Sequence, residues 1–160
     1  MHIRSEVAAD IPAIRELIAE AFGQHQEAEL FDRLRHDGDL IVSLVAEDDT
    51  ALIGHVAFAN LRSPPAALAL APVSVLPQRQ RQGVGSALIR HGLAEAAAKG
   101  YGLSFVVGEP SYYQRFGFSL ATAAPYPSPY AGPYFMATSL GGAPAMPMPV
   151  VYPDAFAGLT

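Results

Sequence analysis

The sequence predicts one α/β domain, residues 1–160, in which a mixed sheet is flanked by helices. Strand-like and helix-like patterns follow one another in the order strand, two helices, three strands, helix, strand, helix. The chain has 160 residues, of which 51% are hydrophobic and 16% charged. This balance suits a single globular domain with a substantial apolar core.

The first half of the chain supplies a strand, two helices and a hairpin. The alternating stretch His2 to Glu6 indicates a short strand, and Asp10 is placed to cap the helix after it. Apolar residues then recur at helical spacing, at positions 11, 14, 17, 18 and 22. A second short helix is expected from about Gln26 to His36. Two β-rich runs, Leu40 to Glu47 and Ala51 to Asn60, flank a polar turn and predict a hairpin.

The second half begins with the most apolar strand of the chain, Ala66 to Leu76. Pro72 within it cannot donate to a strand ladder, so we expect a bulge or a parting of strands near this residue. A helix is predicted from Gly83 to about Lys99. A short strand, Leu103 to Gly108, and a brief helix between Pro110 and Gly117 follow.

Residues 121–160 form an apolar segment that follows a core of residues 1–120. Asp154 is the only charged residue of this segment, and eight of the 14 prolines lie in it. Its many tyrosines and other apolar side chains are unsuited to a solvated tail. We expect a strand at about Tyr134 to Leu140, and packing of the segment on the domain or on a second subunit. The second arrangement predicts a homodimer.

Composition excludes several classes of function. The formal net charge is -5 with only 10 basic residues, which argues against binding of nucleic acid. There is no cysteine, so disulfides, thiolate catalysis and cysteine-based zinc sites are excluded. The histidines show no metal-ligand spacing, and we expect no metal. No apolar run reaches the length of a membrane helix and no signal-peptide core is present, so a cytoplasmic location without membrane contact is expected.

The stretch "QRQRQGVGSALI", Gln78 to Ile89, predicts an anion site. Gly83 and Gly85 leave no Cβ where a ligand approaches the backbone, and a helix begins there. The N–H groups of residues 81–86 therefore converge on one point, next to Arg79 and Arg81. A diphosphate is the natural ligand. No Gly-Lys-Ser/Thr follows, as a Walker loop requires, and the third glycine of a Rossmann fingerprint is missing.

These residues carry a resemblance to a known family. The stretch "VSVLPQRQRQGVGSALI" resembles the acetyl-coenzyme A motif of the GNAT N-acetyltransferase superfamily, in which Gln80, Gly83 and Gly85 occupy the defining positions. The stretch "YYQRFGF", from Tyr112 to Phe118, resembles the tyrosine-containing helix of the same superfamily. With "GHVAF", these motifs are most similar to the YhbS-like branch of predicted acetyltransferases.

The resemblance implies a mostly antiparallel sheet that is splayed at its fourth and fifth strands. Acetyl-coenzyme A (acetyl-CoA) would be the cosubstrate, with its pantetheine arm in the gap between these strands. The implied function is transfer of the acetyl group to a primary amine of a small molecule or peptide, by direct attack in a ternary complex. The residues expected to bind the cosubstrate are Val73, Val75, Gln80, Arg81, Gln82, Gly83, Val84, Gly85 and Ser86.

Acetyl transfer also needs proton management, because free alkylamines and thiols have pKa values of about 10.4 and 8.5. Tyr113 aligns with the tyrosine that acts as general acid in the family, whereas Tyr112 is expected to serve packing. The splayed strand carries no carboxylate to act as base. Glu27, His55 and Glu109 are the candidate bases, and a chain of water molecules is the alternative.

Two alternatives to an acetyltransferase stay open at this point. The first is a non-catalytic module that binds acyl-CoA and acts as a sensor or regulator. The second is a structural, partner-binding role, which is based on the uncharged tail. For an acetyltransferase, the apolar and aromatic segment 121–160 favours an uncharged or hydrophobic acceptor over a polycation.

Overall fold

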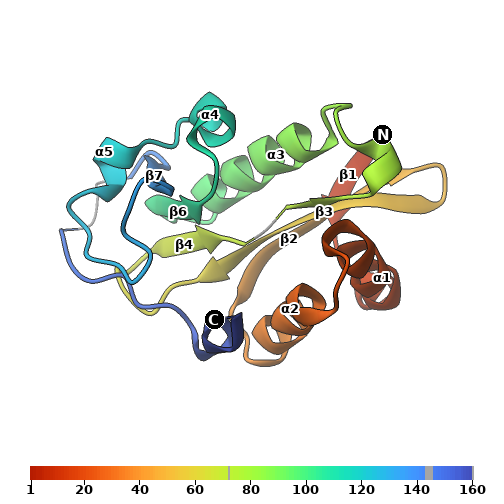
Figure 1. Ribbon diagram of the computed structural model, residues 1–160, viewed down its shortest axis with the longest axis horizontal. Helices are drawn as coiled ribbons and strands as arrows, with labels where there is room; N and C mark the ends of the chain where they lie inside the picture. Colours follow the sequence, from red (N-terminus) through yellow and green to blue (C-terminus); the bar gives the residue numbers. More distant parts are fainter. Residues whose placement is uncertain (72, 143–145, 160) are drawn as a thin grey trace.

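A seven-stranded, mostly antiparallel sheet forms the centre of the protein in the computed structural model, which describes residues 1–71, 73–142 and 146–159 (Figure 1). The main path of strands runs β1-β2-β3-β4-β6-β7, and β5 pairs with β3 beside β4. The strands are β1 (His2–Ser5), β2 (Leu40–Asp48), β3 (Ala51–Asn60), β4 (Ala67–Leu70), β5 (Ser74–Val75), β6 (Leu103–Val107) and β7 (Phe135–Ser139).

Helices cover both faces of this sheet. Helices α1 (Ile11–Phe22) and α2 (Gln26–His36) lie on one face, and α3 (Val84–Ala98) lies on the other (Figure 1). Because both faces are covered, nearly every residue of β3 from Ile53 to Ala59 is buried. The two cores alternate along β3: Val56 and Phe58 belong to the cluster under α3, and the intervening alanines belong to the cluster under α1 and α2.

The predicted parting of strands is present. Residues Ala67–Ala69 of β4 pair in parallel with Leu103–Phe105 of β6, whereas β5 pairs with β3 and, among the described residues, with no other strand. The register on β3 also shifts by one residue between the pairs Phe58–Leu70 and His55–Ser74. This shift has the signature of a bulge, which bends a strand away from its neighbour. Pro72, to which the sequence assigned the bulge, lies outside the described residues.

The predicted helix cap at Asp10 is wrong. The Asp10 carboxylate accepts hydrogen bonds from Arg4 Nη1 and Nη2 at 2.8 and 2.9 Å, and from the backbone N–H of Val7 at 2.8 Å. Asp10 thus closes a short 3₁₀ turn, Ala8–Asp10, and its side chain makes no capping bond to α1. The ion pair with Arg4 of β1 fixes the carboxylate in this place.

The segment after residue 108 wraps over one end of the sheet. Helix α4 (Pro110–Tyr113) continues into a 3₁₀ turn, Gln114–Phe116, and ends at Gly117 as predicted. A short helix α5 (Leu120–Ala123) and a final 3₁₀ helix η4 (Asp154–Leu159) carried no clear periodicity in the sequence. The predicted strand near residues 134–140 is β7, at the edge of the sheet beside β6.

The described part of segment 121–160 packs on the rest of the same chain. Tyr126 and Val150 are buried in a cluster with Phe105 of β6, and Ala155 of η4 is buried against α1 and α2. The homodimer stays a prediction. Among the described residues, no helix combines the length and the apolar character needed to cross a membrane.

Candidate active site

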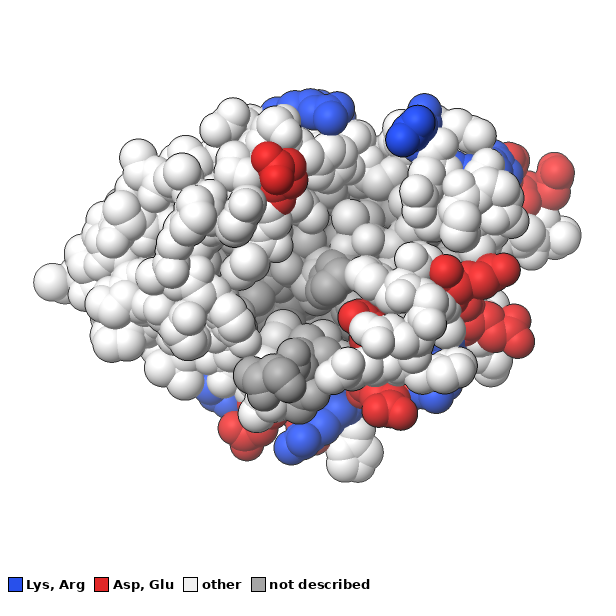
Figure 2. All heavy atoms as spheres, in the orientation of Figure 1, with Lys and Arg blue, Asp and Glu red and all other residues white. Residues whose placement is uncertain are grey.

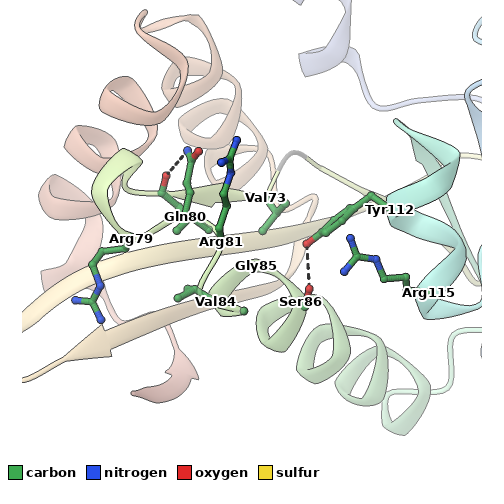
Figure 3. Close-up of a pocket in the computed structure, with 11 residues that line it drawn as sticks. Val73, Arg79, Gln80, Arg81, Val84, Gly85, Ser86, Tyr112 and Arg115 are labelled. Carbon is green, nitrogen blue, oxygen red and sulfur yellow. Dashed lines mark hydrogen bonds between the residues drawn. The ribbon is translucent and has the colours of Figure 1, made fainter.

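A cavity of about 520 Å³ lies between β5 and the N-terminus of α3, where the sheet parts (Figure 3). It is open to solvent along one side, and its walls come from β5, the loop after it, α3 and the α4 region. The lining residues are Val73, Val75, Arg79, Gln80, Arg81, Gly83, Val84, Gly85, Ser86, Tyr112 and Arg115. The structure therefore brings together all the residues predicted to bind the cosubstrate except Gln82.

The loop that opens α3 has the backbone shape of an anion site. Arg81 and Gly83 both adopt left-handed backbone conformations, with φ values of 65° and 83°. The first intrahelical bond runs from the N–H of Ala87 to the carbonyl of Gly83 at 3.1 Å. The N–H groups before Ala87 have no partner within the helix, and the helix dipole adds positive potential there. Such a turn presents several N–H donors to one anion.

The arginines at the cavity have different partners. Arg79 binds Asp48 through Nη2 at 2.7 Å and Gln82 through Nε at 3.1 Å, and Figure 3 shows its side chain directed away from Arg115. Gln82 is thus engaged with Arg79 and does not line the cavity. Arg81 makes no ion pair among the described residues and is exposed beside the opening. Arg115 stacks over the Tyr112 ring, 4.9 Å from its centroid.

Gly85 is required by a close approach. A Cβ atom at this position would lie 3.1 Å from the Tyr112 hydroxyl and 3.6 Å from Val75 Cγ2. The Tyr112 hydroxyl also lies 3.4 Å from Ser86 Oγ, so α4 is joined to the first turn of α3 at the wall of the cavity. Gln80 holds the opposite wall, because its side-chain amide donates to the Val75 carbonyl at 3.2 Å.

A second cavity of about 450 Å³ begins where the first ends, and Val73 lines both. It lies between β4, β6, the end of α1 and the C-terminal segment. The lining residues are Phe22, Ala69, Leu70, Ala71, Val73, Phe105, Val106, Val107, Tyr113, Tyr130, Tyr152 and Phe156. The parted strands thus separate two chambers: one at α3 that arginines and other polar side chains line in part, and an apolar one beyond it.

The adjacent tyrosines of α4 line different chambers. Tyr112 faces the first cavity, and Tyr113 faces the second. Burial raises the pKa of Tyr113 to about 12, and the neighbouring phenol of Tyr112 contributes in the same direction. Tyr113 is therefore a neutral donor throughout the ordinary pH range. The sequence had assigned Tyr112 to packing and did not identify Arg115; their i, i+3 spacing on one helical face was the available signal.

The candidate bases lie apart from both cavities. Glu27 is half-buried in the first turn of α2, where it accepts from the Gln24 amide at 3.1 Å. His55 is fully buried on β3 beneath α2, with its ring edge-to-face against Phe31 at 5.1 Å. Glu109 is exposed at the start of α4. None of the three lines either cavity.

His55 belongs to a buried polar cluster behind the sheet. Ser43 donates to Glu6, so His55 Nε2 donates to Ser43 Oγ at 2.9 Å and Nδ1 is left without a partner. Burial lowers the pKa of His55, and contact with Glu6 opposes this only in part. Burial also disfavours ionisation of Glu6, but His55, Arg35 and Ser43 outweigh it and lower the Glu6 pKa to about 2.

In residues 1–71, 73–142 and 146–159, no group of three or more His, Asp or Glu side chains is arranged to hold a metal ion. The polar groups of the first cavity are backbone donors, three arginines and the side chains of Gln80, Ser86 and Tyr112. This set contains no carboxylate and suits an anion better than a cation.

Comparison with known proteins places residues 2–121, which include the loop of residues 80–86, in one protein family. Residues 2–121 match the family of acetyltransferase (GNAT) domains, and the chain belongs to that family. The family predicted from the sequence motifs is thereby confirmed. Among the relatives, the uncharacterized N-acetyltransferase YhbS of Escherichia coli K12 is 38% identical over 125 residues, which span 76% of this chain and 75% of YhbS.

Two solved structures share this architecture. The crystal structure of E. coli YhbS in complex with CoA aligns with a TM-score of 0.87 and 31% identity, over 98% of this chain and 91% of that one. A GNAT family acetyltransferase from Brucella melitensis in complex with acetyl-CoA aligns with a TM-score of 0.83 and 36% identity, over 97% of both chains. The predicted fold class is confirmed by both.

Proposed function

We propose that this acetyltransferase moves the acetyl group of acetyl-CoA to a primary amine, by direct attack within a ternary complex. The observation that carries the proposal is the loop of residues 80–86, whose left-handed turns and helix start aim N–H donors into a cavity beside an open strand edge. The two similar structures with CoA and acetyl-CoA support the same ligand here.

In the proposed complex, the pyrophosphate of acetyl-CoA accepts hydrogen bonds from the backbone of residues 81–86. Gln80 holds the end of β5, and Val84 closes the floor of the cavity. Gln82 acts indirectly, through Arg79. The pantetheine arm follows the edge of β5 that β3 leaves open, past Val75 and Val73. The thioester then lies near Val73, where the two cavities meet.

The reaction begins with attack of the amine nitrogen on the thioester carbonyl carbon. A C–N bond forms, the tetrahedral intermediate collapses, and the C–S bond breaks with its electron pair on sulfur. Tyr113 donates its phenolic proton to the departing thiolate, which leaves as the free thiol. The amine nitrogen releases one proton to solvent, and solvent returns one proton to the Tyr113 phenolate. The protons therefore balance over one turnover. Placing both reactants in one complex supplies most of the rate gain.

The nitrogen proton passes to water at the mouth of the cavities in this proposal. Glu27 and His55 remain alternative bases, and each is tested by replacement with glutamine. His55 is fully buried and bonded to Ser43, so its substitution acts first on stability. Glu27 accepts from the Gln24 amide at the half-buried start of α2, so its replacement distinguishes a glutamate base from water with little effect on the core.

The test is release of free thiol from acetyl-CoA in the presence of amines, beside calorimetric titration with acetyl-CoA. The chain contains no cysteine, so a thiol reagent reports CoA alone. Amine-dependent thiol release, lowered in Tyr113→Phe at unchanged acetyl-CoA affinity, is the expected result. Tight acetyl-CoA binding with no amine consumed favours the regulatory module, and the absence of binding removes both functions.

A further inference from the structure

We propose that the second cavity binds the acceptor and selects amines that carry one compact apolar group, such as a phenyl ring, over polyamines and charged amines. This inference depends on the proposed function, because it assigns the acceptor of that reaction. The cavity volume of about 450 Å³ falls in the range of small-molecule sites.

Aromatic side chains from distant parts of the chain meet in this cavity. Phe22 ends α1, whereas Tyr130, Tyr152 and Phe156 come from the C-terminal segment. The Tyr130 and Tyr152 rings stand edge-to-face at 4.9 Å, and the Tyr152 and Phe156 rings lie 5.3 Å apart. These contacts hold the rings as a fixed wall, to which an aromatic or branched aliphatic group packs well.

The described walls of the cavity offer no carboxylate to pair with a second positive charge. Among the residues that the structure describes, none that lines this cavity is charged. In Figure 2 the left part of the face, which carries β6, β7 and α5 in Figure 1, is predominantly white. The hollow near the centre of the whole face also has mostly uncharged walls. Moving an unpaired ammonium into such a place is costly. The apolar wall also favours the uncharged amine, which is the form that attacks.

The position of the cavity orients the acceptor. Val73 lies at the junction with the CoA cavity, and Tyr113 lies in the wall beside it. The amine end therefore points to Val73, and the apolar body points toward Tyr152 and Phe156. Burial raises the pKa of Tyr152 to about 12, so its hydroxyl is a neutral group at the far wall. An acceptor with one amine at one end and an apolar group at the other fits this polarity.

A matched pair of substitutions tests the assignment. Val107 lines the cavity and is 49% exposed, whereas Val151 is 47% exposed and does not line it. We expect Val107→Lys to place a cation at the apolar wall and to weaken 2-phenylethylamine binding to the CoA-saturated protein by about tenfold or more. Val151→Lys should stay within about twofold of the unmodified protein. Phe22→Lys repeats the test if Val107→Lys melts early.

The probes are 2-phenylethylamine, ethanolamine and spermidine, measured by calorimetry with CoA and by thiol release with acetyl-CoA. Preference for 2-phenylethylamine by about tenfold in both measurements supports the inference. Equal or stronger use of spermidine, or equal effects of the two lysine substitutions, overturns it. Failure of the proposed function is separate: it is seen as loss of acetyl-CoA binding, or as 2-phenylethylamine binding without any acetyl transfer.

Discussion

The hydroxyl of Tyr112 on α4 lies 3.4 Å from Oγ of Ser86 in the first turn of α3. This contact turns Tyr112 toward the first cavity, while the next residue, Tyr113, lines the second, apolar cavity. Two consecutive tyrosines thus line different cavities, on either side of the point where the sheet parts between β4 and β5. Their roles in the proposed reaction differ for this reason.

Substitutions of Tyr112 and Tyr113 should have different effects on turnover. Tyr113→Phe should lower kcat by about 10²-fold or more, since the leaving thiolate loses its proton donor, with little change in acetyl-CoA affinity. Tyr112→Phe removes only the contact with Ser86 and should affect kcat by less than about tenfold. Steady-state kinetics and calorimetry of both variants check this. Equal losses of kcat would contradict the assignment of Tyr113 as the acid.

The pH profile follows from the pKa of Tyr113, raised to about 12. A group with so high a pKa stays protonated, so no loss of activity from tyrosine ionisation is expected up to about pH 10. Instead, kcat/KM should rise with pH as the amine loses its proton. A profile measured from pH 6 to 10 checks this, and a descending limb near pH 8 that disappears in Tyr113→Phe would show a lowered tyrosine pKa instead.

Gly85 provides a steric test of the cavity. Gly85→Val places a branched side chain where even a Cβ atom lies 3.1 Å from the Tyr112 hydroxyl. The added methyl groups enter the first cavity, on the proposed path of the pantetheine arm. Acetyl-CoA affinity should fall by about tenfold or more. Gly38→Ala is the control: its φ of 78° makes alanine strained, but nothing lies within 4 Å of the new Cβ. It should cost about 1 kcal/mol of stability and leave affinity unchanged.

The electrostatic contribution to acetyl-CoA binding can be tested by comparing substitutions of Arg81 and Arg33. Arg81 lies at the loop, and Arg33 is an exposed arginine of α2 paired with Asp37. Arg81→Gln should weaken acetyl-CoA binding about five- to tenfold at low salt, and less at high salt, because exposed charges are screened. Arg33→Gln should have no such effect. Titrations at two ionic strengths separate these outcomes, and identical salt dependence in all proteins would contradict the role of Arg81.

The buried cluster around His55 predicts acid sensitivity. The pKa of Glu6 falls from 4.5 to about 2 on folding, so its stabilising effect is complete above about pH 4.5 and is lost as the pH drops toward 2. The pKa of His55 is lowered from 6.5 by burial, so unfolding takes up a proton below that pH and stability again falls with acid. Thermal melting should show a Tm that declines from pH 7 to pH 3.

Glu6→Gln should reduce this decline below pH 4.5 and lower the free energy of unfolding at pH 7 by about 2 kcal/mol, because Arg35 loses the closer of its two charged partners, Glu6 and Asp32. The exposed carboxylate Glu29 supplies the control variant, Glu29→Gln. A melting curve for Glu6→Gln that follows the unmodified protein at every pH would exclude this cluster as the source of the acid response.

Local pattern predicted most of the fold. Helix α2 begins and ends where the sequence placed it, at Gln26 and His36, and the hairpin of β2 and β3 follows the two predicted β-rich runs. Two exceptions have identifiable physical causes. Asp10 failed as a cap because Arg4, on a neighbouring strand, binds its carboxylate. Helix α5 spans four residues, too few for a periodic signal.

The sequence by itself determined the family, the order of the elements and the loop of residues 80–86, because these depend on glycine positions and on contacts between near neighbours. Only the tertiary structure decided which side chains share a cavity. It placed Arg115 beside that loop, moved His55 into the core, and brought Phe22 of α1 to Tyr152 near the other end of the chain. Such juxtapositions depend on how packed layers superimpose distant segments, and no local pattern of residues records that.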